Sequence, residues 1–399
     1  MDRLAYLSHL NLTNFRSLVE LDLELPPGVV VFFGPNAQGK TTLLEAVYLL
    51  AIARSFRAGD EREVVNFQAA AEGGQGLVGG TVEQQGERLQ IYVGYQCLPG
   101  VPGSGAPDVR PYGAGRRGLS VRKQIRVSRV RRTASELVGL VTAVLFSADD
   151  IRLVQGPPAD RRRFLDILIS QADPLYLKGL QRYQRVVQQR NQLLRMLRDG
   201  RAQAGELAFW DDELVREGAW ITCRRHEVIE ALAPSCAEHH RQLSGPEEDL
   251  QVEYRPSVPL GDGLPATEDR FRESLAAAAP RERATAGTAV GPHRDDFDLR
   301  INEVDMGTFA SRGQARTLAL TLRLAEAAYL ASVRGEGPII LLDDVLSELD
   351  AQRGKRVLEK ATQYEQTLIT TTEPENIRGF FGPAATYFSV AGGGVHPCP

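Results

Sequence analysis

The chain carries a glycine-rich segment between a predicted strand and a predicted helix, and no other feature constrains its fold as strongly. Residues Gly34–Thr41 match the phosphate-binding pattern G-x-x-x-x-G-K-[ST]. The apolar run Val29–Phe33 before them predicts a buried strand, and Thr42–Leu50 after them predicts a helix. Strand, loop and helix in this order are typical of open α/β sheets that bind a nucleotide. We therefore expect an α/β fold.

This segment supplies the groups that a nucleoside triphosphate and its metal ion require. Glycines let consecutive backbone N–H groups surround phosphate oxygens, and the helix N-terminus adds partial positive charge. We expect Lys40 to reach the β- and γ-phosphates and the Thr41 hydroxyl to bind Mg²⁺. ATP and Mg²⁺ are the predicted cofactors, and a glycine-rich turn without a ligand is the weaker alternative. The predicted nucleotide contacts here are Gly34, Pro35, Asn36, Ala37, Gln38, Gly39, Lys40, Thr41 and Thr42.

Near the C-terminus, a predicted buried strand ends in two acids. Pro338–Asp344 contains four consecutive aliphatic residues followed by Asp343 and Asp344. Such a strand delivers carboxylates to the sheet edge where α/β proteins bind ligands. We expect Asp343 to hold Mg²⁺ opposite Thr41, and Asp344 to orient or deprotonate the attacking water. Two carboxylates that cap the next helix are the alternative.

A serine- and glycine-containing block precedes a long amphipathic helix predicted at 315–333. Ser311 is a natural N-cap, so a plain helix start is one interpretation. The other is a second phosphate contact, because Ser311, Gly313 and Gln314 lie shortly before the Asp343 strand. This order is similar to the signature of ATP-binding cassettes, in which the helix N-terminus contacts the γ-phosphate of ATP held by another subunit.

Together these blocks resemble the ABC ATPases of DNA maintenance, the SMC and RecF group. Further blocks extend the resemblance over nearly the whole chain: Asn14–Ser17, Phe146–Asp150, Gly156–Asp166, Gly291–Asp296 and Leu342–Asp350. The resemblance implies an ABC-type ATPase head with an inserted helical arm. We expect residues 1–160 and 286–399 to form the ATPase lobe, and 161–285 the arm and connector. Helices are predicted at about 160–171, 174–199 and 205–243, with 244–280 as a connector.

The resemblance also implies a function in recombinational DNA repair and replication-fork recovery. A member of this group would bind gapped DNA or single-strand/double-strand junctions as an ATP-dependent homodimer, and would work with RecR and RecO to load RecA. Asn14 and Arg16 would approach the nucleotide. The roles of Lys40, Ser311, Asp343 and Asp344 carry over by motif position. We expect a cytoplasmic protein, in agreement with four scattered cysteines that lack metal spacing.

Three departures from the ABC pattern predict slow hydrolysis. The carboxylate at the catalytic position is Asp344, where most ABC ATPases have Glu. Residues 368–373 offer Thr or Glu in place of a histidine, and 146–151 contain no glutamine to sense the γ-phosphate. We therefore expect a weak, DNA-stimulated ATPase in which hydrolysis acts as a timer.

A basic run in the first half is the candidate DNA surface. The net charge is -4, so a DNA-binding surface must be local. Between residues 116 and 132 there are eight basic residues and no acid: Arg116, Arg117, Arg122, Lys123, Arg126, Arg129, Arg131 and Arg132. Contacts to phosphate alone predict low sequence preference and steep salt dependence.

Two other functions remain open alternatives. The phosphate-binding segment and the signature also suit the nucleotide-binding subunit of an ABC transporter, and an SMC-like nuclease-associated ATPase is the second alternative. About 300 residues separate Lys40 from Asp343, which disfavours the transporter. Among the histidines, we expect His293 to be hydrogen-bonded in a turn and His239–His240 to lie on the surface.

Overall fold

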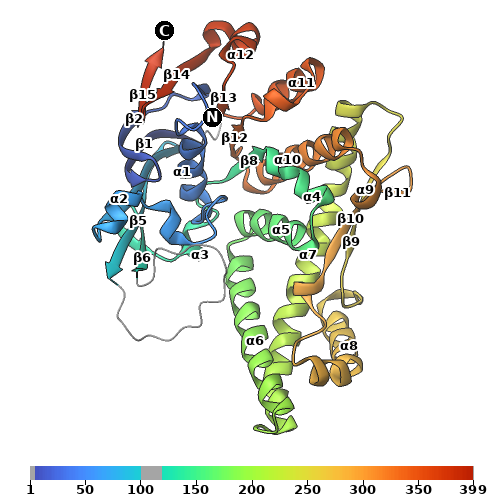
Figure 1. The fold of residues 1–399 in the computed structure, drawn as a ribbon. Helices are drawn as coiled ribbons and strands as arrows, with labels where there is room; N and C mark the ends of the chain where they lie inside the picture. Colours follow the sequence, from blue (N-terminus) through green and yellow to red (C-terminus); the bar gives the residue numbers. More distant parts are fainter. Residues whose placement is uncertain (1–4, 100–118, 399) are drawn as a thin grey trace. The chain divides into compact units, whose positions relative to one another are not determined.

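The computed structural model describes residues 5–99 and 119–398, which form two compact units (Figure 1). The first unit contains Met1–Ala148 and Arg334–Pro399, and the second contains Asp149–Val333. Each unit combines sheet and helix, so the predicted α/β fold is confirmed.

The first unit contains an antiparallel sheet that begins with the two N-terminal strands. Alternation of buried and less buried residues along these strands gives the sheet one core face and one outer face. Its strands, in spatial order, are β2 (Leu18–Glu24), β1 (Ala5–Phe15), β4 (Gln75–Gln84), β5 (Glu87–Pro99), β6 (Leu119–Val127) and β7 (Val130–Arg132).

The second sheet of this unit is parallel except at one edge. Parallel strands buried on both faces are typically apolar runs, as β3 and β12 are. Strand β13 is equally buried but contains one glutamine and three threonines. In spatial order the strands are β15 (Gly394–Cys398), β14 (Ala385–Ala391), β3 (Gly28–Phe33), β13 (Gln366–Thr371), β12 (Ile339–Asp343) and β8 (Ala143–Ser147). Only β15 runs antiparallel to its neighbour.

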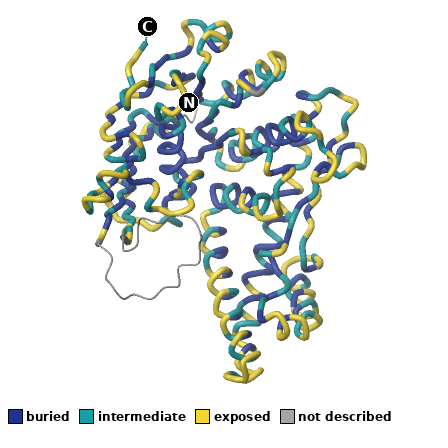
Figure 2. Tube along the Cα trace, viewed as in Figure 1, coloured by how far each residue is buried: buried dark blue, intermediate teal, exposed yellow. Residues whose placement is uncertain are grey.

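Helix α1 (Lys40–Ile52) lies between these two sheets. It contacts β1, β4 and β5 of the first sheet and β8, β12 and β13 of the second. Its residues are buried along almost the whole helix, which explains why its sequence is apolar all round (Figure 2). The sheet-bearing unit is completed by α2 (Phe67–Ala71), α3 (Ala134–Leu137), α11 (Ala351–Ala361) and α12 (Pro374–Phe381), with 3-10 turns η1 (Glu61–Val64), η5 (Val345–Glu348) and η6 (Gly382–Ala384).

The second unit is mainly helical. Its long helices pack side by side, and a small sheet of β11 (Val304–Asp305), β10 (Asp296–Ile301) and β9 (Leu250–Arg255) joins them. The helices are α4 (Arg152–Gln155), α5 (Pro158–Ala172), α6 (Pro174–Arg198), α7 (Leu207–Ser244), α8 (Gly263–Thr285), α9 (Met306–Phe309) and α10 (Arg312–Arg334), with turns η2 (Ala148–Ile151), η3 (Ala204–Glu206) and η4 (Pro292–Arg294). The three predicted arm helices correspond to α5, α6 and α7.

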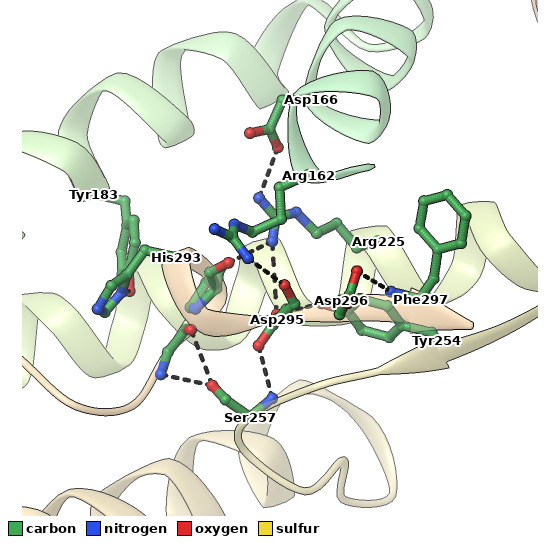
Figure 3. A network of polar contacts seen from close by, with 12 residues as sticks. Arg162, Asp166, Tyr183, Arg225, Tyr254, Ser257, His293, Asp295, Asp296 and Phe297 are labelled. Carbon is green, nitrogen blue, oxygen red and sulfur yellow. Dashed lines mark hydrogen bonds and ion pairs between the residues drawn. The ribbon is translucent and has the colours of Figure 1, made fainter. Parts of the chain in front are cut away.

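A buried polar network fixes the helices of this unit to its sheet (Figure 3). The guanidinium of Arg225 on α7 is almost fully buried and donates to Asp166 on α5 at 2.8 Å and to the Pro292 carbonyl at 2.6 Å. Arg162 donates to the Asp295 carbonyl at 2.8 Å. Because a buried charge is costly unless paired and hydrogen-bonded, these contacts hold the segments in one arrangement.

The unit boundaries differ from the predicted domain division. Residues 286–333, which we expected in the second part of the ATPase lobe, lie in the same compact unit as the arm. The reason is visible in the contacts: Arg161 on α5 pairs with Asp296 on β10 at 2.6 Å, and Arg323 on α10 pairs with Asp150 at 2.6 Å. The first pair joins β10 to the arm, and the Arg323 guanidinium joins α10 to it by lying over the Phe164 ring of α5, 5.3 Å from the ring centroid.

Two other expectations were wrong. The predicted connector 244–280 contains β9 and most of α8. The apolar residues of α8 recur only weakly at helical spacing, but burial of its Phe271 and Leu275 stabilises the helix. His240 is buried, with Nε2 2.8 Å from Glu248 and Nδ1 3.4 Å from the Thr321 hydroxyl. The turn prediction for His293 is confirmed, because its ring contacts the Tyr183 hydroxyl at 2.6 Å and the Thr288 carbonyl at 3.1 Å.

Candidate nucleotide-binding site

The glycine-rich segment connects β3 to α1 as a tight loop. Gly39 caps the helix with a φ of 104°, and Ala37 also adopts a positive φ of 63°. Gly34 passes so close to β14 that a Cβ there would lie 2.2 Å from the Val390 carbonyl oxygen. Glycine is therefore required at Gly34 for packing, while Gly39 allows the turn into the helix.

Lys40 is held across this loop. It is largely buried, and its Nζ donates to the Gly34 and Pro35 carbonyls at 2.7 and 2.8 Å. Burial lowers the pKa of the Lys40 ammonium, and the nearby charges of Asp344 and Asp343 oppose that shift. The ammonium can exchange these carbonyl contacts for phosphate oxygens without leaving the loop.

Acid and hydroxyl groups from two neighbouring strands meet the start of α1. Asp343 ends β12 and is in register with Thr370 on β13. The hydroxyls of Thr41 and Thr370 both donate to Asp343 Oδ1 at 2.8 Å. Asp344 follows with a φ of 52°, and its N–H donates to the Thr370 hydroxyl at 3.0 Å. Parallel strands end at one edge of the sheet, so these groups are adjacent despite the distance in sequence.

These groups open into one cavity of about 840 Å³ in the first unit. Predicted site residues provide one wall, and the segment that contains η1 and α2 provides another. The lining residues are Arg16, Ser17, Asn36, Ala37, Gly39, Lys40, Thr41, Thr42, Arg57, Glu63, Val65, Phe67, Asp343, Asp344 and Thr370. The volume and the mixed charge suit a nucleotide.

Arg16 and Glu45 form a buried ion pair beside this cavity. Glu45 on α1 is fully buried, and Arg16 donates to its carboxylate from Nε at 3.1 Å and from Nη2 at 2.6 Å. Arg16 also donates to the Glu63 carbonyl at 2.8 Å, and the Ser55 hydroxyl donates to Glu45. Since Arg16 lines the cavity, the pair with Glu45 orients the Arg16 guanidinium at the cavity wall.

Some predicted contacts lie elsewhere. Asn14 is not among the lining residues, and its amide donates to the Gln75 carbonyl at 3.1 Å. Gly34 and Pro35 contribute carbonyls to Lys40 instead of surface to the cavity. The Gln38 side chain accepts from the Gly392 N–H at 2.8 Å.

The Ser311 block belongs to the second unit, at the start of α10. The Ser311 hydroxyl accepts from the Gln314 N–H at 3.2 Å, and the Gln314 side chain accepts from the Ser311 N–H at 3.1 Å. This reciprocal capping box fixes the helix N-terminus. Ser311 and Gly313 are exposed and Gln314 is half-buried, and a Cβ added at Gly313 would meet no atom within 4 Å.

The oxygen groups at the strand ends fit a magnesium ion. Mg²⁺ is bound in proteins by one or two carboxylates together with substrate phosphates. Thr41 and Asp343 already share a contact of 2.8 Å, so both can face one ion. In the part of the chain that the structure describes, no group of three or more His, Cys, Asp or Glu forms a separate metal site.

The basic run divides between two faces of the first sheet. Arg122 and Arg126 on β6, Arg129 in the turn, and Arg131 on β7 are exposed. Lys123 points to the opposite face, where it pairs with Glu61 at 2.5 Å and lies over the Tyr95 ring. Arg132 pairs with Glu136 at 3.5 Å. Arg116 and Arg117 lie outside the described residues.

Sequence reasoning missed Thr370, Phe67 and Glu45. The signal for Thr370 was its position after Leu368 and Ile369, near the end of the strand that pairs with the Asp343 strand. Phe67 lines the cavity with 69% of its surface exposed, and Glu45 is fully buried. Neither stands out in a linear sequence.

In residues 5–99 and 119–398, no helix has the length and apolarity needed to cross a bilayer.

Comparison with known proteins agrees with this site. The AAA domain family matches residues 9–89, which include the phosphate-binding loop. The DNA replication and repair protein RecF of Herpetosiphon aurantiacus is 38% identical over 400 residues, covering 98% of this chain and 100% of that protein. RecF of Chloroflexus aurantiacus is also 38% identical, covering 98% of this chain and 99% of that protein.

Solved structures show the same architecture. The recombination mediator protein RecF-ATP of the RecFOR pathway is 31% identical with a TM-score of 0.87, over 100% of this chain and 99% of that one. The Smc head domain from Pyrococcus furiosus has a TM-score of 0.53 at 14% identity, over 99% of this chain and 96% of that one. The predicted ABC-type ATPase head is thereby confirmed.

Proposed function

Because the chain belongs to the RecF family, we propose that it is an ATP-dependent DNA-binding protein of recombinational repair. The observation that carries the proposal is the joined set of Lys40, Thr41, Asp343 and Thr370 in one cavity at the strand ends. The names of the relatives, DNA replication and repair protein and recombination mediator, support the role in repair.

Each residue of the site has a defined part in nucleotide binding. The loop N–H groups and the α1 N-terminus receive the phosphates, and Lys40 neutralises the β- and γ-phosphates. Thr41 and Asp343 hold Mg²⁺, which when bound offsets phosphate charge. Arg16, kept in place by Glu45, adds positive charge at the cavity wall. Asp344 orients the attacking water.

ATP joins two copies of the chain in this proposal. The N-terminus of α10, with Ser311, Gly313 and Gln314, contacts the γ-phosphate of ATP on the partner subunit. The exposed helix start supports this role, because the capping box uses the Gln314 N–H and leaves those of Arg312 and Gly313 without an acceptor in the helix. ADP lacks the γ-phosphate and so favours separation. A coupling of about 1–3 kcal/mol per site would be typical of such linkage.

The dimer joined by ATP binds gapped DNA or a single-strand/double-strand junction. It acts together with RecR and RecO, and this binding leads to RecA loading. Exposed arginines of the basic run contact phosphates, and no base-reading motif is present in the sequence. Hydrolysis is slow because the carboxylate at the catalytic position is the shorter Asp344. DNA stimulates this hydrolysis, which acts as a timer on the bound state.

The test combines sedimentation with DNA binding in ATP, ADP and no nucleotide. We expect ATP-dependent dimers for the native chain, and loss of ATP binding in Lys40→Met. Ser311→Arg should abolish the dimer but keep ATP binding, because Ser311 contacts only the partner's nucleotide. Equal DNA affinity and a monomer in all three nucleotide conditions would refute the proposal.

A further inference from the structure

The first sheet has one face packed on α1 and one polar outer face. Along β5 and β6, Ile91, Val93 and Ile125 are buried on the α1 side, while Tyr92 and Arg126 alternate with them. Successive residues of a strand point to opposite faces, so Tyr92 and Arg126 belong to the outer face.

A row of directly paired residues crosses this outer face. Strand register aligns, from one edge to the other, Asp22, Asn11, Gly79, Tyr92, Arg126 and Arg131. Side chains that are directly opposite lie about 5 Å apart. The row therefore places an aromatic ring at its middle, arginines on one side and an acid at the far edge.

The Tyr92 ring lies over the backbone of Gly79. A Cβ on Gly79 would be 2.9 Å from Tyr92 Cδ1 and 2.0 Å from Asn11 Oδ1, so the ring and the amide both lie over that residue. Beside Tyr92 on the same face, a Cβ on Gly94 would have no atom closer than 3.9 Å. The Tyr92 ring therefore rests on the Gly79 backbone, and Gly94 places no side chain beside it.

The arginines next to this ring are available for an anion. Among the ion pairs of the described residues, none involves Arg122, Arg126, Arg129 or Arg131, and all four are exposed. The β6–β7 turn places Ser128 and Arg129 at positive φ values of 46° and 70°. A two-residue turn of this type favours Gly or Asn, so this turn keeps an arginine at the sheet edge despite backbone strain.

We propose that this face binds single-stranded nucleic acid, with one base stacked on Tyr92 and adjacent phosphates held by Arg126 and Arg131. The inference rests on the proposed DNA-binding function and names the strand form that this surface takes. Bases of a single strand expose their faces, whereas those of a duplex are stacked on each other. An acidic protein surface could pair with the arginines, but it would not use the Tyr92 ring that lies over Gly79.

The experiment compares ligands on the full-length chain. Affinities for a 20-nucleotide thymidine strand, an abasic strand of that length and a 20-base-pair duplex are measured by fluorescence anisotropy. Tyr92→Ala should weaken binding to the thymidine strand by about 5- to 150-fold, the range of one lost base stack. Binding of Tyr92→Ala to the abasic strand and to the duplex should stay within about twofold of native. Tyr92→Phe should bind like the native chain because it keeps the ring.

Tyr6→Ala is the matched control, because this tyrosine lies on β1 of the same sheet in register with Glu83. It should leave all three affinities unchanged. Arg126→Gln should weaken all three ligands and reduce the salt slope by roughly 0.7 on the single strand. A thermal melt checks that each variant folds.

The outcomes separate this inference from the proposed function. A native chain that binds DNA, with a Tyr92→Ala variant that binds the thymidine strand equally well, would overturn only the stacking surface. Equal losses on the thymidine and abasic strands would also overturn it. A native chain that binds no nucleic acid in any nucleotide state, or binds only an acidic protein through these arginines, would overturn both.

Discussion

Replacing Arg16 by Met should destabilise the first unit strongly, because it leaves the Glu45 carboxylate buried without its main partner. Glu45 is fully buried and receives two of the Arg16 donors at 3.1 Å or less. Removing one member of a buried pair typically costs about 3–5 kcal/mol. Ser55 still donates to Glu45 and Arg57 remains 3.7 Å away, so we expect the lower end, ~3 kcal/mol.

Thermal unfolding measures this cost. For a unit of about 200 residues, ~3 kcal/mol corresponds to a fall in Tm of roughly 6–12 °C. Arg241→Met is the control, since Arg241 and Glu238 form a pair with both side chains about half exposed. That variant should lose no more than about 1 kcal/mol.

A double-mutant cycle identifies the cause. Glu45→Gln in the Arg16→Met background removes the buried charge and should restore part of the lost stability. ATP affinity should stay low in the double variant, because Arg16 itself lines the cavity. The reasoning is refuted if Arg16→Met costs less than about 1 kcal/mol, or if the two substitutions are additive.

Four further outcomes follow from the geometry. Gly34→Ala should abolish ATP binding and lower Tm, because its Cβ would lie 2.2 Å from the Val390 carbonyl oxygen; Gly313→Ala, with open space, should keep the native Tm. Phe67→Ala should weaken binding of ATP but not of tripolyphosphate in calorimetry, because its exposed ring lines the cavity and offers the base a surface to stack on. Asp343→Asn should reduce phosphate release by about 10²-fold or more and weaken the Mg²⁺ dependence of ATP binding; an unchanged rate would contradict its role. Burial lowers the pKa of His293, so its charged form is disfavoured in the folded state and stability should fall as the pH drops below about 6.5; urea titrations of His293→Asn should show a shallower pH dependence than native.

Much of the site could be predicted from sequence because its parts are local. A phosphate-binding loop needs a strand, glycines and a helix in consecutive positions, and these are contiguous from Val29 to Leu50. The Asp343 strand was recognisable because buried parallel strands are continuously apolar. The Ser311 capping box is also local, but its contact with a partner's nucleotide remains a prediction.

Other features depend on partners that are distant in the chain. Lys123 belongs to an unbroken basic run, yet strand alternation turns it towards Glu61. The sequence predicted a surface position for His240, but in the structure this residue of α7 packs against Thr321. The units also differ from the sequence blocks, because the Arg161–Asp296 ion pair joins β10 to α5 and the His240–Thr321 contact joins α10 to α7.

The sequence by itself determined the chemistry of the phosphate-binding loop and the two acids at the C-terminal end of β12, and with them the family resemblance. Each of these motifs is a short contiguous segment, so local backbone geometry is enough to specify it. Only the tertiary structure decided which charges are paired and which are exposed. It alone brought Thr370 to Asp343 and Glu45 to Arg16, and aligned Tyr92 with Arg126. The physical reason is that burial and strand register are set by contacts between distant segments, and no window of sequence contains both partners.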